Sequence, residues 1–105
     1  MTVKRNYMRA IPKEWRALAK VFVALGDEHR QRILLTFEKG ERLTVGQIAE
    51  VATLSRPAVS HHLKILRDAG VLTAERAGRE VYLRVNREVL EQTLSTVLDY
   101  VRTES

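Results

Sequence analysis

Hydrophobic positions recur with helical spacing over the first third of the chain. Residues 13–25 carry apolar side chains three or four positions apart, the spacing of one helical face. These are Trp15, Leu18, Phe22 and Leu25. A second helix is predicted from the N-cap residue Asp27 to about Lys39. Residues 1–11 show no clear period, so we expect a basic N-terminal arm there and a single domain over residues 12–105.

Two further helices are predicted in the middle of the chain. Thr44 and Gln47 form a capping-box pattern that opens a short helix through Val51. After a turn over residues 52–54, a fourth helix occupies residues 55–70. Its limits follow from an N-cap serine, a proline in the first turn and a terminal glycine, which are Ser55, Pro57 and Gly70. Its apolar stripe is narrow and consists of Val59, Leu63 and Leu66.

After Gly70 the hydrophobic period changes from helical spacing to alternation. Residues 71–76 and 80–85 resemble two strands joined by Ala77-Gly78-Arg79, and helical spacing returns over residues 87–102. The predicted fold is mainly α with a β-hairpin wing, in the order α-α-α-α-β-β-α. Two short helices joined by a tight turn and followed by a basic hairpin describe a winged helix-turn-helix.

Charge and composition favour an anionic partner. The 105 residues carry a formal net charge of +5. Residues 55–87 hold seven basic and three acidic side chains, a balance of +4, whereas residues 88–105 hold one basic and four acidic, a balance of −3. A generally basic, solvated surface is the other interpretation. The absence of cysteine excludes disulfides, zinc–thiolate sites and thiol redox sensing within this chain. Without a long apolar run or a secretory segment, we expect a cytoplasmic protein without membrane contact.

The outer face of the helix over residues 55–70 carries donors and cations, which suits the DNA major groove. Arg56 and Ser60 are the strongest candidates for base edges, while Lys64 and Arg67 are expected to hold phosphate. Arg79, helped by Arg76 and Arg84, is expected to reach phosphate or the minor groove; an ordinary turn arginine is the alternative. The predicted DNA-contacting residues are Thr44, Gln47, Arg56, Pro57, Ser60, His61, Lys64, Arg67, Arg76 and Arg79.

Several polar residues favour structural roles. His61 and His62 point about 100° apart on a helix, so they do not readily chelate one ion. His62 is expected to bond across the helix-turn-helix, and His29 to lie on the surface. Arg30 and Arg32 are expected to pair with Glu28 or Glu38 as an alternative to meeting DNA. With no phosphate loop, nucleophile–base pair or metal cluster in the sequence, we expect neither an enzyme nor a cofactor.

The order and spacing of these segments resemble the ArsR/SmtB family of bacterial winged-helix repressors from about Leu18 to Val101. The segments that carry the resemblance are residues 25–34, 43–49, 60–66, 70–72 and 78–83. The resemblance implies a homodimer, built from the first and last helices, that binds an inverted-repeat operator in double-stranded DNA. The alternative is that both helices close the monomer core. The predicted dimerisation residues are Trp15, Leu18, Phe22, Leu90, Leu94, Val97, Leu98 and Val101.

The family's two metal sites have no matching ligands here. The cysteine positions of one site correspond to Thr44 and Gly46, and the last helix has carboxylates but no histidine for the other. A metal-independent regulator is therefore predicted. An unknown small-molecule effector could bind between the first and last helices, with Val21, Phe22, Leu94 and Leu98 as candidates; a ligand-free dimer core is the other interpretation.

Two alternative functions use the same fold. A winged helix can dock a protein partner through its basic face, or it can bind DNA non-specifically as an architectural protein. The salt dependence of binding separates DNA from protein, because phosphate contacts release counterions.

Overall fold

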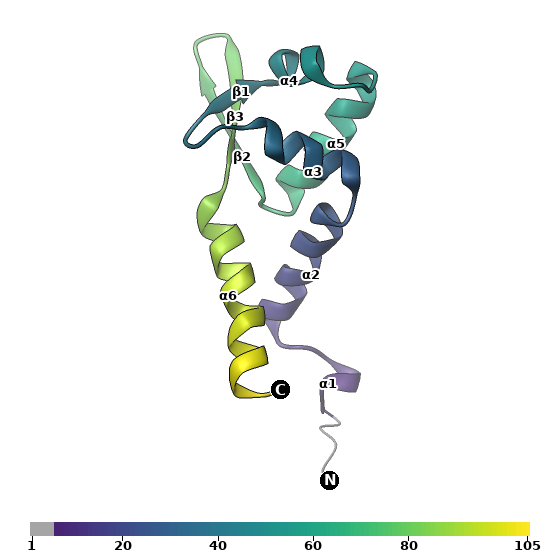
Figure 1. Cartoon of the computed structure of the whole chain (residues 1–105), viewed down its shortest axis with the longest axis vertical. Helices are drawn as coiled ribbons and strands as arrows, with labels where there is room; N and C mark the ends of the chain where they lie inside the picture. Colours follow the sequence, from purple (N-terminus) through teal and green to yellow (C-terminus); the bar gives the residue numbers. More distant parts are fainter. Residues whose placement is uncertain (1–5) are drawn as a thin grey trace.

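The computed structural model describes residues 6–105. Figure 1 shows a helix-turn-helix body with a hairpin on one side, from which two longer helices extend in the same direction. The helices are α1 (Asn6–Arg9), α2 (Lys13–Leu25), α3 (Glu28–Thr36), α4 (Val45–Val51), α5 (Arg56–Asp68) and α6 (Arg87–Thr103). The strands are β1 (Arg42–Thr44), β2 (Leu72–Ala77) and β3 (Glu80–Val85).

The apolar stripes of the sequence meet in one core. Val59, Leu63 and Leu66 of α5 are at most 2% exposed and pack with residues of the neighbouring helices and strands. The other fully or nearly buried members of this core are Val21, Ala24, Ile33, Ile48, Val71, Leu72 and Leu83. Helices α2, α3, α4 and α5 and the sheet all contribute apolar surface to this core. Its removal from water holds the helix-turn-helix against the wing.

The sheet has three antiparallel strands in the order β1-β3-β2. Strands β2 and β3 form the predicted hairpin, with Leu72 opposite Val85 and Ala77 opposite Glu80, and Gly78 adopts a positive φ of 64° at its turn. Strand β1 was not predicted, so the described elements run α-α-α-β-α-α-β-β-α. It is only three residues long and depends on pairing with β3, Leu43 opposite Leu83, which local alternation does not reveal.

Two helical boundaries also differ from the prediction. Helix α3 ends at Thr36, before the expected end near Lys39, because Phe37 turns to an extended conformation and packs against the core. Residues Asn6–Arg9 form one helical turn within the expected arm. Lys4 and Arg5, which the sequence placed in that arm, lie outside the described residues. The boundary between arm and domain stays a prediction.

Helices α2 and α6 lie side by side at their far ends, where the Trp15 and Tyr100 rings meet edge to face at 5.7 Å (Figure 1). Both helices leave large apolar side chains exposed: Phe22 by 41%, Leu94 by 57%, Leu98 by 45% and Val101 by 52%. Within the described part of the chain, no helix has the length and apolar character needed to cross a membrane.

Candidate nucleic-acid interface

Helix α5 begins and ends where its sequence predicts. The Ser55 side chain accepts a hydrogen bond from the Ala58 amide, and Pro57 occupies the first turn, where its missing N–H leaves no bond unmade. At the other end Gly70 adopts a positive φ of 82°, and the Val71 amide donates back to the Leu66 carbonyl. These two ends fix which side of the helix faces outward.

The buried stripe of α5 leaves its opposite face in solvent. Arg56, Pro57, Ser60, His61, Lys64 and Arg67 are all exposed. Those with polar side chains offer hydroxyl, imidazole, ammonium and guanidinium donors along one helix, a set that matches base edges and phosphates of a duplex. The structure thus brings the six predicted α5 residues together on one surface; that they contact DNA stays a prediction.

The two predicted contacts of α4 serve first as its cap. The Gln47 amide donates to Thr44 Oγ1 at 3.1 Å, and the Thr44 amide donates to Gln47 Oε1 at 2.9 Å. The capping box is therefore confirmed. The Arg56 guanidinium lies beside this first turn. Its Nη2 is 3.9 Å from the position that a Cβ would occupy at Gly46. The Arg56 side chain therefore reaches from the start of α5 to the first turn of α4.

Lys64 is not an isolated cation. Its ammonium lies 2.8 Å from Oδ2 of Asp68, one turn further along α5. The hydrogen bond from Lys64 lowers the pKa of Asp68 below its ordinary value. Both side chains are well exposed, so water screens the pair and a phosphate can compete for the ammonium.

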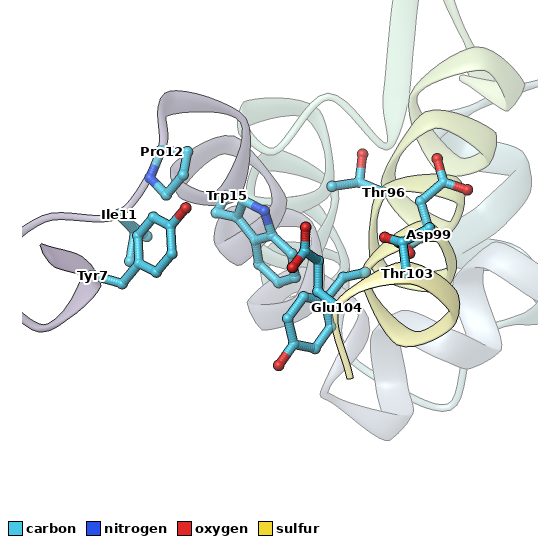
Figure 2. A pocket seen from close by; sticks show the side chains of 9 residues that line it. Tyr7, Ile11, Pro12, Trp15, Thr96, Asp99, Thr103 and Glu104 are labelled. Carbon is cyan, nitrogen blue, oxygen red and sulfur yellow. The ribbon is translucent and has the colours of Figure 1, made fainter. Parts of the chain in front are cut away.

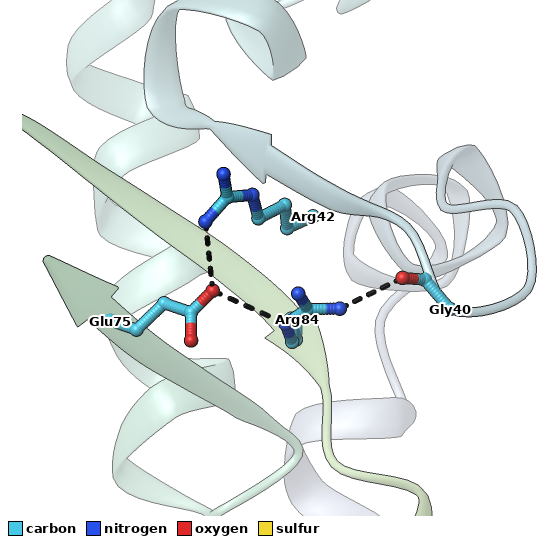
Figure 3. Close-up of polar contacts among 4 residues, drawn as sticks. All are labelled: Gly40, Arg42, Glu75 and Arg84. Carbon is cyan, nitrogen blue, oxygen red and sulfur yellow. Dashed lines mark hydrogen bonds and ion pairs between the residues drawn. The ribbon is translucent and has the colours of Figure 1, made fainter. Parts of the chain in front are cut away.

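The base of the wing contains an ion-pair network that the sequence did not indicate (Figure 3). Oε1 of Glu75 lies 3.2 Å from Nη1 of Arg42 and 3.3 Å from Nε of Arg84. Arg84 also donates to the Gly40 carbonyl at 2.8 Å, and the Arg42 guanidinium lies 4.1 Å from the centre of the Tyr82 ring. The hydrogen bond from Arg42 lowers the pKa of Glu75.

This network changes the interpretation of Arg84. We expected Arg84 to help Arg79 at the hairpin tip, but Arg84 joins β3 to Glu75 of β2 and to the loop before β1. Arg42 and Arg84 lie directly opposite on paired strands, so the carboxylate between them offsets the repulsion of two like charges. Arg76 and Arg79 are exposed near the turn, and their contact with DNA stays a prediction.

Arg30 forms the junction between α2, α3 and α5. It donates from Nε to the Ala24 carbonyl at 2.7 Å and from Nη2 to the Val23 carbonyl at 3.2 Å. These carbonyls end α2, where a cation is favourable. The predicted pairing of Arg30 with Glu28 or Glu38 is therefore wrong, because its donors satisfy backbone groups across the chain turn. Arg32 lies 3.4 Å from Nδ1 of His29.

His62 has a structural role, as predicted, but the expected bond across the helix-turn-helix is wrong. Its Nδ1 lies 3.2 Å from Nη1 of Arg30, so the bond reaches α3 rather than the neighbouring α4. Since a guanidinium has donors only, His62 Nδ1 must accept this hydrogen bond. Nδ1 therefore carries no proton, and the imidazole is neutral. Burial lowers the pKa of His62, and the positive charge of Arg30 acts in the same direction while Asp27 opposes it.

The residues described provide no group of three metal-ligating side chains.

The cavity between α2 and α6 differs from the small-molecule site that was expected at Val21, Phe22, Leu94 and Leu98. A cavity of about 510 Å³ does lie between α2 and α6, and Val21 lines it, but its other walls come from residues such as Leu18, Val89 and Thr93. Phe22, Leu94 and Leu98 turn to solvent, because they occupy the outer sides of their helices.

The predicted dimerisation residues differ in how far the monomer already buries them. Leu18 is 6% exposed within the monomer, and Leu90 packs against the core. Trp15 and Val97 are half-buried. Phe22, Leu94, Leu98 and Val101 are exposed and form the part of the set that a second chain could cover.

Comparison with known proteins agrees with this geometry. Residues 27–74 match the model of the family described as bacterial regulatory protein, arsR family. The transcriptional repressor SdpR of Bacillus subtilis is 38% identical over 81 residues, which cover 77% of this chain and 89% of SdpR. The transcriptional repressor SmtB of Mycobacterium tuberculosis is 39% identical over 69 residues, 66% of this chain and 50% of SmtB.

Solved structures share the same architecture. An ArsR-like transcriptional regulator from Rhodococcus superposes with a TM-score of 0.78 at 30% identity, over 84% of this chain and 82% of the other. The homodimeric winged helix-turn-helix domain of a Mycobacterium bovis protein matches with a TM-score of 0.68 at 22% identity, over 100% and 94%, and supports the fold. The fold together with these relatives identifies the chain as a DNA-binding transcriptional regulator. The chain belongs to the ArsR family of bacterial regulatory proteins, whose members are regulators and not enzymes.

Proposed function

We propose that this protein is a homodimeric repressor that binds an inverted-repeat operator. The observation that carries the proposal is that α5 has one buried stripe and one exposed face. The exposed face consists of six residues on successive turns of the helix, from Arg56 to Arg67. In this arrangement the N-terminal half of α5 enters the major groove, where Arg56 and Ser60 read base edges. Relatives described as repressors support the direction of regulation.

The remaining predicted contacts extend the same footprint. Lys64 and Arg67 hold phosphate further along α5, while Thr44 and Gln47 present the first turn of α4 to the backbone. Arg76 and Arg79 carry the wing to the flanking minor groove or its phosphates. The basic arm over residues 1–11 adds cations to this electrostatic attraction, and repression by occupancy of chromosomal DNA implies a cytoplasmic protein.

The dimer is inferred from the exposed apolar side chains of α2 and α6. Phe22, Leu94, Leu98 and Val101 are each more than 40% exposed in the monomer, although side chains of this kind favour burial. A two-fold partner that covers them places two α5 helices about one DNA turn apart, roughly 34 Å. The M. bovis domain is described as homodimeric, which fits this arrangement.

The regulator is proposed to act without a metal ion. Thr44 and Gly46 stand where related proteins use cysteines, and the Thr44 side chain is already engaged in the α4 cap. Helix α6 contributes carboxylates without histidine, a donor set with little preference for transition metals. Operator binding is therefore expected to be the same with and without Zn²⁺.

Selection of bound sequences from a random DNA pool, followed by salt titration of the selected site, tests the proposal. A two-fold symmetric motif with a steep slope of log K against log salt supports the dimeric repressor. Weak, uniform binding with the same slope indicates an architectural protein. Absence of a counterion-release slope indicates a protein-docking role, and either of these outcomes overturns the operator proposal.

A further inference from the structure

The cavity between α2 and α6 is large enough for a small molecule. Its volume of about 510 Å³ lies within the range of ligand sites. Apolar side chains form part of its wall, among them Leu18 and Val21 of α2 and Val89 of α6. Ala69, which directly follows α5, also lines it. Neither the exposed residues proposed for the dimer nor the proposed DNA contacts line this cavity, so it is separate from both proposed interfaces.

The wall contains one buried hydroxyl that lacks a hydrogen bond. Thr93 is 7% exposed and lines the cavity. The other two threonines of α6, Thr96 and Thr103, donate to the carbonyls four residues before them at 2.9 and 2.7 Å. Within residues 6–105 the Thr93 hydroxyl has no such partner, and its oxygen stays accessible from the cavity. Because a buried hydroxyl without a hydrogen bond costs free energy, this position favours a ligand group that bonds to it.

Two carboxylates also line the cavity, one from each long helix. Glu14 lies in the first turn of α2 and Glu88 in the first turn of α6. Because the two helices run in opposite directions, these first turns lie at opposite ends of the cavity (Figure 1). In the described part of the chain neither carboxylate has an ion-pair or hydrogen-bond partner, and no lysine, arginine or histidine lines the cavity. The cavity therefore offers a place for a cation at each end, with the Thr93 hydroxyl between them.

The surroundings of the cavity define its two ends. A Cβ built at Gly70 would lie 3.8 Å from the methyl carbons of Val89, so the Glu88 turn lies beside the end of α5. The other end adjoins the cavity that Trp15 lines at the far ends of α2 and α6, and Thr96 lines both cavities (Figure 2). The eight residues from Glu88 to Thr96 rise about 12 Å along α6, at about 1.5 Å per residue, which gives the length of the cavity along this helix.

We propose that this cavity binds a linear aliphatic polyamine with three amino groups. One terminal ammonium group lies at Glu14 and the other at Glu88, while the inner amine donates to Oγ1 of Thr93. The methylene segments contact the apolar wall, and an extended triamine is comparable in length to the cavity. With a net charge of +5, the chain has no general attraction for a polycation, so binding depends on this local arrangement. The inference does not rest on the repressor proposal, because no proposed DNA contact takes part.

Calorimetric titration of the full-length protein without DNA tests the proposal. Spermidine is compared with 1,8-diaminooctane, which has the same chain length but lacks the inner amine. We expect saturable binding of spermidine and an apparent Kd about tenfold weaker for the diamine, the ratio that one hydrogen bond from a charged group implies. Equal affinities for the two amines, or no saturable binding of spermidine, overturn the proposal.

A variant of Thr93 separates the hydrogen bond from the extra charge of spermidine. Thr93→Val keeps the branched shape of the side chain and removes the hydroxyl, so it should weaken spermidine binding about tenfold and leave the affinity for the diamine unchanged. Thr103→Val is the matched control, because Thr103 donates to the Asp99 carbonyl and lies outside this cavity. If Thr93→Val binds spermidine as tightly as the unaltered protein does, the proposal is wrong.

Charge-removing variants complete the test. Glu14→Gln and Glu88→Gln each remove the carboxylate at one end and should weaken the binding of both amines about threefold. Glu91→Gln removes the same charge from α6 outside the cavity, where Glu91 pairs with Arg87, and should leave both affinities unchanged. Equal losses in all three variants would reduce the effect to general electrostatics and overturn the proposal. Operator binding measured without polyamine tests the repressor proposal separately.

Discussion

Arg30 and His62 connect α5 to the end of α2. One guanidinium nitrogen of Arg30 lies 3.2 Å from Nδ1 of His62, while the other donors of Arg30 reach the carbonyls of Ala24 and Val23. Helix α2 carries exposed apolar residues proposed for the dimer, and α5 carries the residues proposed for DNA. The Arg30–His62 contact is therefore a direct polar link between the two proposed interfaces.

This contact predicts a loss of stability in mild acid. The pKa of His62 is lowered from its ordinary value of 6.5, so as the pH falls the unfolded chain binds a proton before the folded chain does. The folding stability that neutral His62 contributes is fully present above pH 6.5. It is lost as the pH falls through the lowered pKa of His62 in the folded protein. Urea unfolding at about pH 8 and about pH 5.5 should show a lower midpoint at the acid pH.

Two substitutions separate His62 from other titrating groups. His62→Asn keeps an acceptor near the position of Nδ1 but cannot titrate, so the fall between the two pH values should be smaller. His61→Asn changes the adjacent, exposed histidine, and the urea midpoint of this variant should fall with pH as much as that of the unaltered protein. If His62→Asn retains the full pH dependence, His62 is not the group responsible.

Arg30→Ala should destabilise the fold by about 1–3 kcal/mol, because two carbonyls at the end of α2 and His62 Nδ1 lose a charged donor. Arg32→Ala is the matched control on α3, where the side chain is exposed and its contact with His29 is long at 3.4 Å. Its effect should stay below about 0.5 kcal/mol. Chemical denaturation of both variants at neutral pH gives the comparison, and similar values for the two would contradict the capping role of Arg30.

The sequence predicts this fold well where local signals agree with burial. Ser55, Pro57 and Gly70 set the limits of α5 through backbone preferences that act within a few residues, and Val59, Leu63 and Leu66 show its buried side. All of these are found where expected. The exposed face of α5 follows by geometry, so the candidate DNA surface could be placed before its surroundings were known.

Contacts between distant segments could not be predicted in the same way. Glu75 lies between Arg42 and Arg84 only because the three-residue strand β1 pairs with β3, and so short a strand has no periodic signal of its own. The donors of Arg30 reach carbonyls six and seven positions earlier because the chain reverses at Gly26 and Asp27. The cavity at the far ends of α2 and α6 is lined by Tyr7 and Trp15 and also by Tyr100, more than eighty residues later.

Removing a base contact and removing a phosphate contact should have different signatures. Arg56→Ala is expected to weaken binding to the selected operator by about 1–3 kcal/mol and to relax specificity at one base position. Lys64→Ala should weaken binding to all sequences alike and reduce the salt slope by about one. Gel-shift titrations on the operator and on its single-base variants distinguish them, and unchanged affinity of Arg56→Ala would contradict the placement of α5.

Glu75→Gln tests whether the Glu75 carboxylate offsets the positive charges of Arg42 and Arg84 at the base of the wing. Arg42 and Arg84 would lose their shared carboxylate, and since all three side chains are about half exposed, stability should change by less than about 1 kcal/mol. Affinity for non-specific DNA should rise, with a steeper salt slope, because two cations are no longer offset. Salt titration with a random duplex measures this effect, and an unchanged slope would place Arg42 and Arg84 away from the duplex.

The dimer can be tested by placing a charge on its proposed surface. Leu98→Asp puts a carboxylate on the exposed face of α6, where a two-fold partner would have to bury it without a counterion. We expect a folded monomer by light scattering and circular dichroism, with operator affinity reduced about a hundredfold or more because two half-sites are no longer held together. Leu35→Asp is the control, since Leu35 is 82% exposed on α3, outside the α2 and α6 surface. If Leu98→Asp remains dimeric, the chains associate through another surface, and the spacing of the two α5 helices must be derived anew.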